Sequence, residues 1–213
     1  PAGLTLYALG TGAHGAQPER GNNALTALLS ALAALPLEDG PSARTIRGLA
    51  GLFPHGDTQG KALELACADE ISGSLTLNFS VLELDQTGFS AQFDCRFPLC
   101  AQEEALLSRL SAALSPLGAE VTDPGLVPPH CVPEDDPFVQ TLLGVYRDYT
   151  GQSARCLAIG GGTYVHDIPG GVAFGCAMPG VDNRMHEPDE FAILDDLVLS
   201  AKMFAQVILD VCG

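Results

Sequence analysis

The chain has 213 residues, 46% of them hydrophobic, which is enough to bury a substantial core in one or two domains. Its formal net charge of −16, with only ten Lys and Arg residues, argues against nucleic acid as a partner, because phosphate binding needs clustered cations. No apolar run approaches the roughly 20 residues of a membrane span, so we expect no membrane insertion either.

Seven cysteines are spread along the chain without a CxxC pair, the spacing typical of zinc knuckles and of dithiol redox motifs. Several lie in apolar runs, such as Cys67 and Cys176, where cysteine packs as a small hydrophobic side chain. This pattern predicts reduced thiols and a cytoplasmic location. The N-terminus enters an alternating run directly, as if the chain had been cut from a longer parent.

Residues 1–128 alternate between strand-like and helix-like patterns. Period-two alternation predicts strands, and apolar positions three and four residues apart predict helices. In chain order, we expect a strand at 4–9, a helix at 22–35 capped by Asn22 or Asn23, an irregular insert at about 36–72, a hairpin of strands at 74–84 and 89–97, a helix at 103–117 and a strand from 119. This order is the split β-α-β-β-α-β pattern of a ferredoxin-like two-layer α/β sandwich, an α+β fold.

A proline-rich connector at 128–137 predicts a domain boundary. Beyond it we expect a helix at 138–149, strands at 154–159 and 171–174, and a closing amphipathic helix at 195–211. This second segment, residues 129–213, is small for a domain of its own. It therefore predicts a partial α/β domain.

Two features of the second segment can carry chemistry. His186 lies among acidic residues, where an imidazole and a neighbouring carboxylate can bind a divalent metal, although an ordinary solvated loop explains the same residues. Glycines 160–162 follow a predicted strand, and their N–H groups can approach an anion closely. A tight turn with positive φ explains them equally well. They fit neither common nucleotide-binding motif, which leaves a nucleotide-binding function poorly supported.

Three polar side chains in the first segment are also candidates. His14 lies in a glycine-rich loop and can donate a hydrogen bond to a carbonyl oxygen as negative charge develops there. Arg96 can hold a carboxylate in a bidentate fork, although a salt bridge to Asp94 or Asp85 is the simpler explanation. Asn78 is a polar position in an otherwise apolar strand.

Two further patterns only imitate catalytic motifs. His55 and Asp57 have the H-x-D form of a metal motif, but they lie in the irregular insert with no strand before them. Glu103 and Glu104 resemble a catalytic carboxylate pair, but they fall in the first turn of a predicted helix, where acids offset the helix dipole. We expect both pairs to be structural.

Taken together, these segments resemble the di-zinc dipeptidases of the peptidase V and carnosinase type, within the aminoacylase and carboxypeptidase G superfamily. Residues 12–18 and 21–24 are similar to the lid entry of peptidase V-like enzymes, S-A-H-(G/A)-x-x-P followed by G-x-N-A. The other similar segments, in order, are residues 94–98, 136–143, 160–164, 171–175 and 185–190. The resemblance covers essentially the whole chain.

The resemblance implies hydrolysis of a dipeptide or a similar N-acyl amino acid by metal-bound hydroxide, with two zinc ions in the parent enzyme. The matching residues are His14 for catalysis, Arg96, Asn78, Gly161 and Gly162 for substrate binding, and His186 for zinc. His14 would stabilise the oxyanion of the scissile carbonyl. Arg96 would bind the C-terminal carboxylate of the substrate, helped by backbone groups of the glycine turn. His186 would bind one zinc, and the match of Asn78 is the least secure.

The sequence departs from this family at its start. Family members begin with a catalytic segment that holds an H-x-D motif, a bridging aspartate, a Glu-Glu pair and another aspartate, and no such segment precedes Leu4. A catalytic zinc needs about three protein ligands, and its water needs a general base. The resemblance therefore implies a lid domain at 1–128 and a C-terminal catalytic segment at 129–213. Alone, the chain would hold zinc incompletely or not at all and would be inactive.

A non-catalytic interpretation stays open. The first segment can be a ferredoxin-like module for dimerisation or ligand binding. In the superfamily that the chain resembles, the lid commonly pairs subunits. We therefore expect a homodimer through the lid as one partner and a small peptide substrate as the other.

Overall fold

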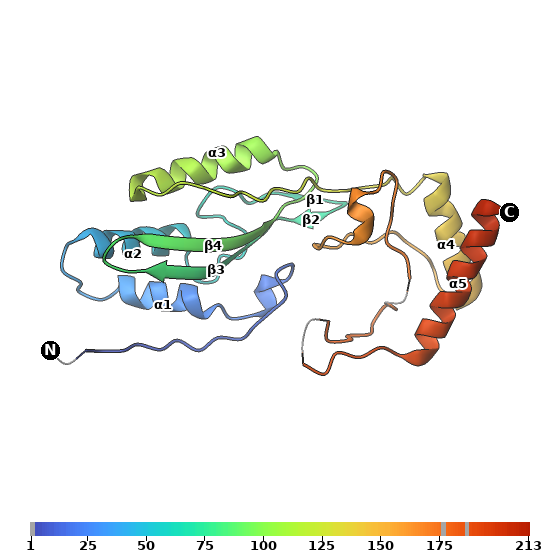
Figure 1. Ribbon diagram of the computed structural model, residues 1–213, viewed down its shortest axis with the longest axis horizontal. Coiled ribbons are helices and arrows are strands. Elements are labelled where there is room, and N and C mark those ends of the chain that lie inside the picture. Colours follow the sequence, from blue (N-terminus) through green and yellow to red (C-terminus); the bar gives the residue numbers. More distant parts are fainter. Residues whose placement is uncertain (1–2, 176–177, 186–187) are drawn as a thin grey trace. The chain divides into compact units, whose positions relative to one another are not determined.

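The computed structural model describes residues 3–175, 178–185 and 188–213 (Figure 1). It divides into unit 1, Pro1–Pro129 with Ile159–Gly161, and unit 2, His130–Ala158 with Gly162–Gly213. The described residues form five α-helices and two antiparallel sheets of two strands each, so the predicted α+β class is confirmed. No helix within the described ranges is both long and apolar enough to cross a bilayer.

A long hairpin is the centre of unit 1. Strand β3 (Thr76–Leu84) pairs with β4 (Phe89–Arg96) across a turn at residues 85–88, as the alternating sequence predicts. A bulge interrupts the register between Phe79 and Val81. Leu77 and Phe79 point into the core and are each only 3% exposed, because successive side chains of a strand face opposite sides.

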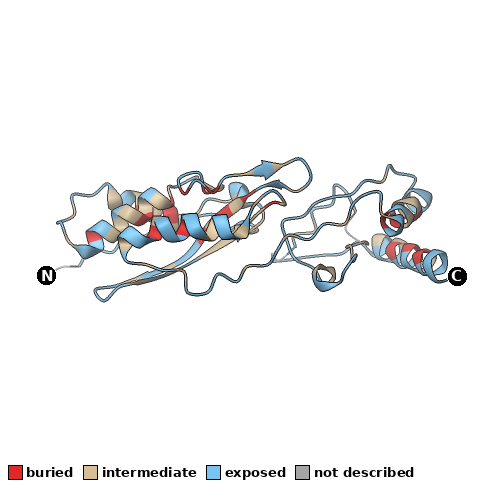
Figure 2. Ribbon diagram, turned by 90° about the horizontal axis from the view of Figure 1, so that it is seen from above, coloured by how far each residue is buried: buried red, intermediate tan, exposed pale blue. Residues whose placement is uncertain are grey.

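Three helices bury leucines in the same core as the hairpin. They are α1 (Ala24–Ala33), α2 (Pro41–Leu52) and α3 (Glu103–Leu114). Each contributes at least one side chain to the buried cluster that contains Leu77 and Phe79, and Figure 2 shows buried positions along these helices. Phe53, next to the end of α2, stacks on Phe79 with ring centroids 4.3 Å apart. The helices thereby fix one face of the hairpin and leave its polar face for other contacts.

Helix α2 lies inside the stretch that was expected to be irregular. Gly48 and Gly51 both fall within it, and each glycine costs a helix about 1 kcal/mol relative to alanine. The helix forms because Pro41 occupies its first turn, where proline is favoured, and because Leu49 becomes completely buried. Tertiary packing therefore overrides the local signal of the glycines.

Several expected strands are not formed in the described residues. Residues 4–9, the stretch from 119, and residues 154–159 and 171–174 belong to no strand, so these predictions were wrong. A segment with alternating side chains forms a strand only when another strand pairs with it. Residues 4–9 pair with no strand in the described part of the chain, and the side chains of Leu4, Tyr7 and Leu9 are 83%, 86% and 91% exposed. The insert instead holds a small hairpin, β1 (Ala68–Asp69) with β2 (Gly73–Ser74). The full ferredoxin-like arrangement stays a prediction.

Unit 2 is built on two helices, α4 (Pro137–Thr150) and α5 (Leu194–Cys212). Asp136 caps α4, since its Oδ1 accepts the Phe138 N–H at 2.8 Å. The helices pack through a small cluster of Leu142, Val145, Met203 and Val207. Both helices agree with the predicted ranges to within a few residues.

Candidate functional site

Four polar side chains share one face of the hairpin at its open end. Thr76 lies opposite Arg96, and Asn78 lies opposite Asp94. Residues two apart in a strand point the same way, so this face is opposite to the one that carries Leu77. All four are half-buried. This polar end of the hairpin is the part of unit 1 in which the predicted site residues meet.

Asp94 holds Arg96 in a bidentate ion pair. The Arg96 Nε donates to Asp94 Oδ1 at 3.0 Å, and Nη2 donates to Oδ2 at 2.9 Å. The third guanidinium nitrogen, Nη1, donates to the Gly160 carbonyl. Of the five N–H groups of an arginine, these bonds use three and leave two. Of the two salt bridges considered from the sequence, the one to Asp94 forms, and Asp85 instead lies in the hairpin turn.

The loop that follows His14 packs directly on this ion pair. A Cβ on Gly15 would lie 2.8 Å from Asp94 Oδ2 and 3.0 Å from Arg96 Nη2, so a side chain here would displace the ends of the ion pair. A Cβ on Gly160 would lie 2.8 Å from the Cβ of Ala16, which is as tight. Two segments far apart in sequence therefore approach the guanidinium at positions where neither has a side chain.

His14 accepts a hydrogen bond at one ring nitrogen. The Ala16 N–H donates to His14 Nδ1 at 3.2 Å, and the Gln17 N–H donates to the His14 carbonyl at 2.8 Å. A neutral imidazole has one bare nitrogen and one N–H. Because Nδ1 accepts, this bond places the proton of the neutral ring on Nε2, which then acts as a donor. The half-buried ring thus has the tautomer that a hydrogen-bond donor to a carbonyl oxygen requires.

Asn78 takes part in a structural network. Its Oδ1 accepts from Asn23 Nδ2 at 2.9 Å, and its Nδ2 donates to Ser80 Oγ at 3.3 Å. The Asn23 amide also donates to the Phe79 carbonyl at 2.8 Å, and its Oδ1 caps α1 by accepting the Thr26 N–H at 3.1 Å. Asn78 therefore helps to tie α1 to the hairpin, and a role in substrate binding stays a prediction.

Four of the six predicted site residues lie at the polar end of the hairpin in unit 1: His14, Asn78, Arg96 and Gly161. His14 adjoins the ion pair through Gly15, and a Cβ on Gly161 would lie 3.6 Å from Arg96 Nη1. Gly162 is assigned to unit 2, where a Cβ on it would have no neighbour within 4 Å. His186 lies outside the described residues. Within the described part of the chain, no group of three or more His, Cys, Asp or Glu side chains could hold a metal ion.

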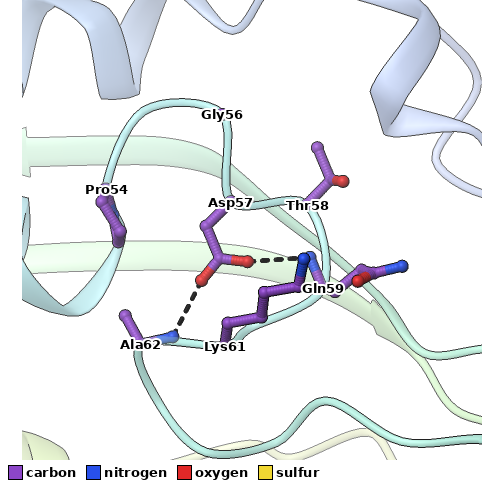
Figure 3. A pocket seen from close by; sticks show the side chains of 7 residues that line it. All are labelled: Pro54, Gly56, Asp57, Thr58, Gln59, Lys61 and Ala62. Atoms are coloured by element: carbon purple, nitrogen blue, oxygen red, sulfur yellow. Dashed lines mark hydrogen bonds between the residues drawn. The ribbon is translucent and has the colours of Figure 1, made fainter.

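Of the H-x-D pattern in the insert, Asp57 lines a surface pocket of about 470 Å³ (Figure 3). Asp57 there accepts the N–H groups of Gln59 at 3.1 Å and of Ala62 at 2.9 Å. Burial raises the pKa of Asp57, but hydrogen bonds from these and neighbouring backbone N–H groups outweigh it, so the pKa lies below 3.8. His55 Nδ1 lies 3.0 Å from the Thr26 hydroxyl. Both side chains have structural partners, which agrees with the structural role expected for them.

The glutamate pair also has the expected position. Glu103 and Glu104 occupy the first turn of α3, where negative charge is favourable.

Sequence reasoning missed the contributions of Asn23, Gly15 and Gly160 to the site. The sequence pattern gives no sign of the contact between Gly15 and the ion pair, because that contact depends on how the loop folds over the hairpin.

Comparison with known proteins identifies the family. Residues 2–122, more than half of the chain, match the M20 peptidase dimerisation domain. This chain therefore belongs to the M20 peptidase family, as its resemblance to peptidase V-type dipeptidases implied. It is 35% identical over 208 residues to the Bacillus subtilis (strain 168) protein named "Putative dipeptidase YtjP". It is 33% identical over 206 residues to the Beta-Ala-Xaa dipeptidase of Lactobacillus delbrueckii subsp. lactis.

The two alignments cover nearly all of this chain but only part of each relative. They include 97% and 96% of the chain, and 44% and 43% of the respective relatives. The chain thus spans less than half the length of the curated relatives that it matches.

Asn23→Ala should destabilise unit 1 by about 2 kcal/mol, since it removes a helix cap and two further hydrogen bonds to β3. Urea unfolding followed by circular dichroism measures the change. Asn22→Ala is the matched control, because Asn22 pairs with Thr11 through backbone atoms alone. Equal unfolding midpoints for the two variants would show that the Asn23 side chain does not tie α1 to the hairpin.

Asp57→Asn should make stability less sensitive to acid. A carboxyl group whose folded pKa lies below 3.8 stabilises the fold above the unfolded pKa, and this contribution disappears as the pH falls through the folded pKa. The wild type should therefore exceed the variant in stability at neutral pH, and the difference should shrink below about pH 4. Thermal unfolding across this pH range tests it, and a difference independent of pH would contradict the argument.

Proposed function

We propose that this chain is the lid and a C-terminal catalytic segment of an M20 metallopeptidase that hydrolyses dipeptides or similar N-acyl amino acids. The observation that carries the proposal is the meeting of Arg96, the glycine turn and the His14 loop at the polar end of the hairpin. A carboxylate clamp beside a carbonyl hydrogen-bond donor suits a short peptide with a free C-terminus. The names of the relatives support a dipeptide as the substrate.

Arg96 binds the substrate carboxylate in this proposal, and Asp94 positions the guanidinium. Asp94 fixes the plane of the guanidinium by two parallel hydrogen bonds, the Gly160 carbonyl accepts a third N–H, and the remaining two N–H groups are left for a ligand. Gly161 lies beside Nη1, so its backbone can approach the same carboxylate without a side chain in the way. Gly162 follows directly and is assigned the same role.

His14 acts on the other end of the scissile unit. Its Nε2–H donates to the carbonyl oxygen of the peptide bond as that oxygen gains negative charge during attack by water. A donor that is already oriented needs no reorganisation during the reaction, so the stabilisation is realised in the transition state. The bond from Ala16 to Nδ1 supports this role, because it sets the required tautomer.

Zinc belongs to the proposal, but the described residues do not form its site. His186 would supply one ligand, whereas a catalytic zinc needs about three. Within the described ranges no cluster of suitable side chains completes the set. We therefore assign no step to the metal here. The remaining ligands and the general base would come from the additional length that the relatives have.

Exposed apolar surface in unit 2 supports its assignment to part of a larger α/β domain. On α5, Leu194, Ile208 and Leu209 are 77%, 61% and 65% exposed. An isolated domain rarely leaves such a row of aliphatic side chains uncovered. Residues 4–9, which are also apolar and extended, would complete the ferredoxin-like sheet of the lid once another strand pairs with them.

A homodimer through the lid is the second candidate function, and it would be the main one if the chain acts without catalysis. The match to a peptidase dimerisation domain favours it. The two functions are separable by experiment, since a dimerisation module keeps its assembly when hydrolysis of peptides is absent. We place either form in the cytoplasm, on the basis of its cysteine use.

Replacing Arg96 with lysine in the full-length peptidase should raise KM for a dipeptide about 10- to 100-fold, because a charge-assisted fork is lost, and should change kcat less. Asp94→Asn should raise KM by a smaller factor, and Asp94→Glu should partly restore it. Steady-state kinetics measure these values. The control is a dipeptide amide, which lacks the carboxylate and should be cleaved alike by all variants. A comparable loss on the amide would refute the carboxylate clamp.

His14→Ala in the same protein should lower kcat about 10²- to 10³-fold with KM nearly unchanged, because the lost bond strengthens only in the transition state. His55→Ala is the matched control, since His55 is an exposed loop histidine whose bond goes to Thr26. It should keep the kcat of the wild type. If both variants lose kcat equally, His14 has no specific part in the reaction.

A further inference from the structure

The small hairpin β1–β2 holds the turn that follows β4. Asp69 closes the hairpin by accepting the N–H groups of Ile71 and Ser72 at 2.9 and 2.6 Å. Its second oxygen, Oδ2, accepts the Cys100 N–H at 3.1 Å, and Ser72 Oγ accepts the Leu99 N–H at 2.8 Å. Two segments about 30 residues apart in sequence are thereby fastened side by side.

This arrangement brings two cysteine side chains together. Cys67 lies two residues before Asp69, and Asp69 Oδ2 accepts the Cys100 N–H, so the two cysteines lie close together. Cys67 and Asp69 are both half-buried, whereas Ala68 between them is exposed. The side chain of Cys100 also acts on that of Cys67 and helps to raise its pKa. Both are free thiols.

The two thiols differ in access. Cys100 is exposed in the turn of residues 98–101, whereas Cys67 is half-buried and packs against the core of unit 1. Burial and the neighbouring Cys100 raise the pKa of Cys67, although the Arg109 guanidinium acts in the opposite direction. An oxidant from solution therefore reacts with Cys100 first, and the neighbouring Cys67 reacts second.

We propose that Cys67 and Cys100 are a peroxide-sensitive pair that closes to an intramolecular disulfide. The Cys100 thiolate attacks one oxygen of hydrogen peroxide, the O–O bond breaks, and Cys100 becomes a sulfenic acid as hydroxide leaves and is protonated to water. The Cys67 sulfur then attacks the sulfenic sulfur. The S–S bond forms, the S–O bond breaks, and a second water leaves with the Cys67 proton. Two thiols are oxidised by two electrons, and one peroxide is reduced to two waters.

Cys95 is the natural control for this pair. Burial raises the pKa of Cys95 to about 11, with Asp94 and Cys67 adding to the effect. A buried thiol that stays protonated is a poor nucleophile. The proposed disulfide therefore joins Cys67 to Cys100 and leaves Cys95 reduced. This inference does not depend on the proposed peptidase function.

The experiment treats the full 213-residue chain, fully reduced, with hydrogen peroxide, blocks the remaining thiols by alkylation and maps peptides without reduction. The expected result is one dominant intramolecular link between Cys67 and Cys100, reversed by dithiothreitol. Cys95→Ser should form the same link at the same rate. In Cys67→Ser the link should disappear, and dimedone should trap a sulfenic acid at Cys100.

The same map contains the outcomes that overturn the proposal. They are a dominant Cys67–Cys95 link, a link between two chains through Cys100, or alkylation of both Cys67 and Cys100 after peroxide has oxidised other thiols of the chain. The map of the wild-type protein decides among them without any variant, so a variant that folds poorly does not leave the question open. Circular dichroism shows whether each serine variant is folded, and only the results of folded variants are used.

Discussion

The site in unit 1 depends on one ion pair, Asp94 with Arg96, formed by two positions on the same face of a strand. A partly exposed pair of this kind contributes at most about 1 kcal/mol to stability, so its importance is geometric. The ion pair fixes the plane of the guanidinium, and Arg96 Nη1 then donates to the Gly160 carbonyl. Close packing by Gly15 then brings the His14 loop to the same place. The pair is thus the point at which the hairpin, the His14 loop and the glycine turn meet.

Local sequence patterns predicted the elements that depend on local interactions. The hairpin, the Asn23 cap of α1, and helices α3, α4 and α5 follow from alternation, capping and helical periodicity. Helix α2 was missed because its glycines suggested a break, while the burial of Leu49 that stabilises it is tertiary. The expected strand at 4–9 failed for the opposite reason, since a correct alternation found no strand to pair with.

The candidate site shows the same division. The register of the hairpin, and hence the pairing of Asn78 with Asp94, follows from a turn that the sequence reveals. The bond between Arg96 and Gly160 joins residues 64 positions apart, and no periodicity predicts it. Only the resemblance to dipeptidases placed Arg96 in one site with the neighbouring Gly161 and Gly162. Long-range contacts of this kind therefore come from family knowledge or from the structure.

The uncovered row of aliphatic side chains on α5 has a consequence for the chain as a solute. Apolar patches attract one another at short range, whereas a net charge of −16 repels at longer range. The Debye length shortens from about 30 Å at 0.01 M salt to about 3 Å at 1 M, so added salt removes the repulsion and leaves the attraction. The tendency of the isolated chain to associate therefore depends on ionic strength, through the exposed side chains of α5.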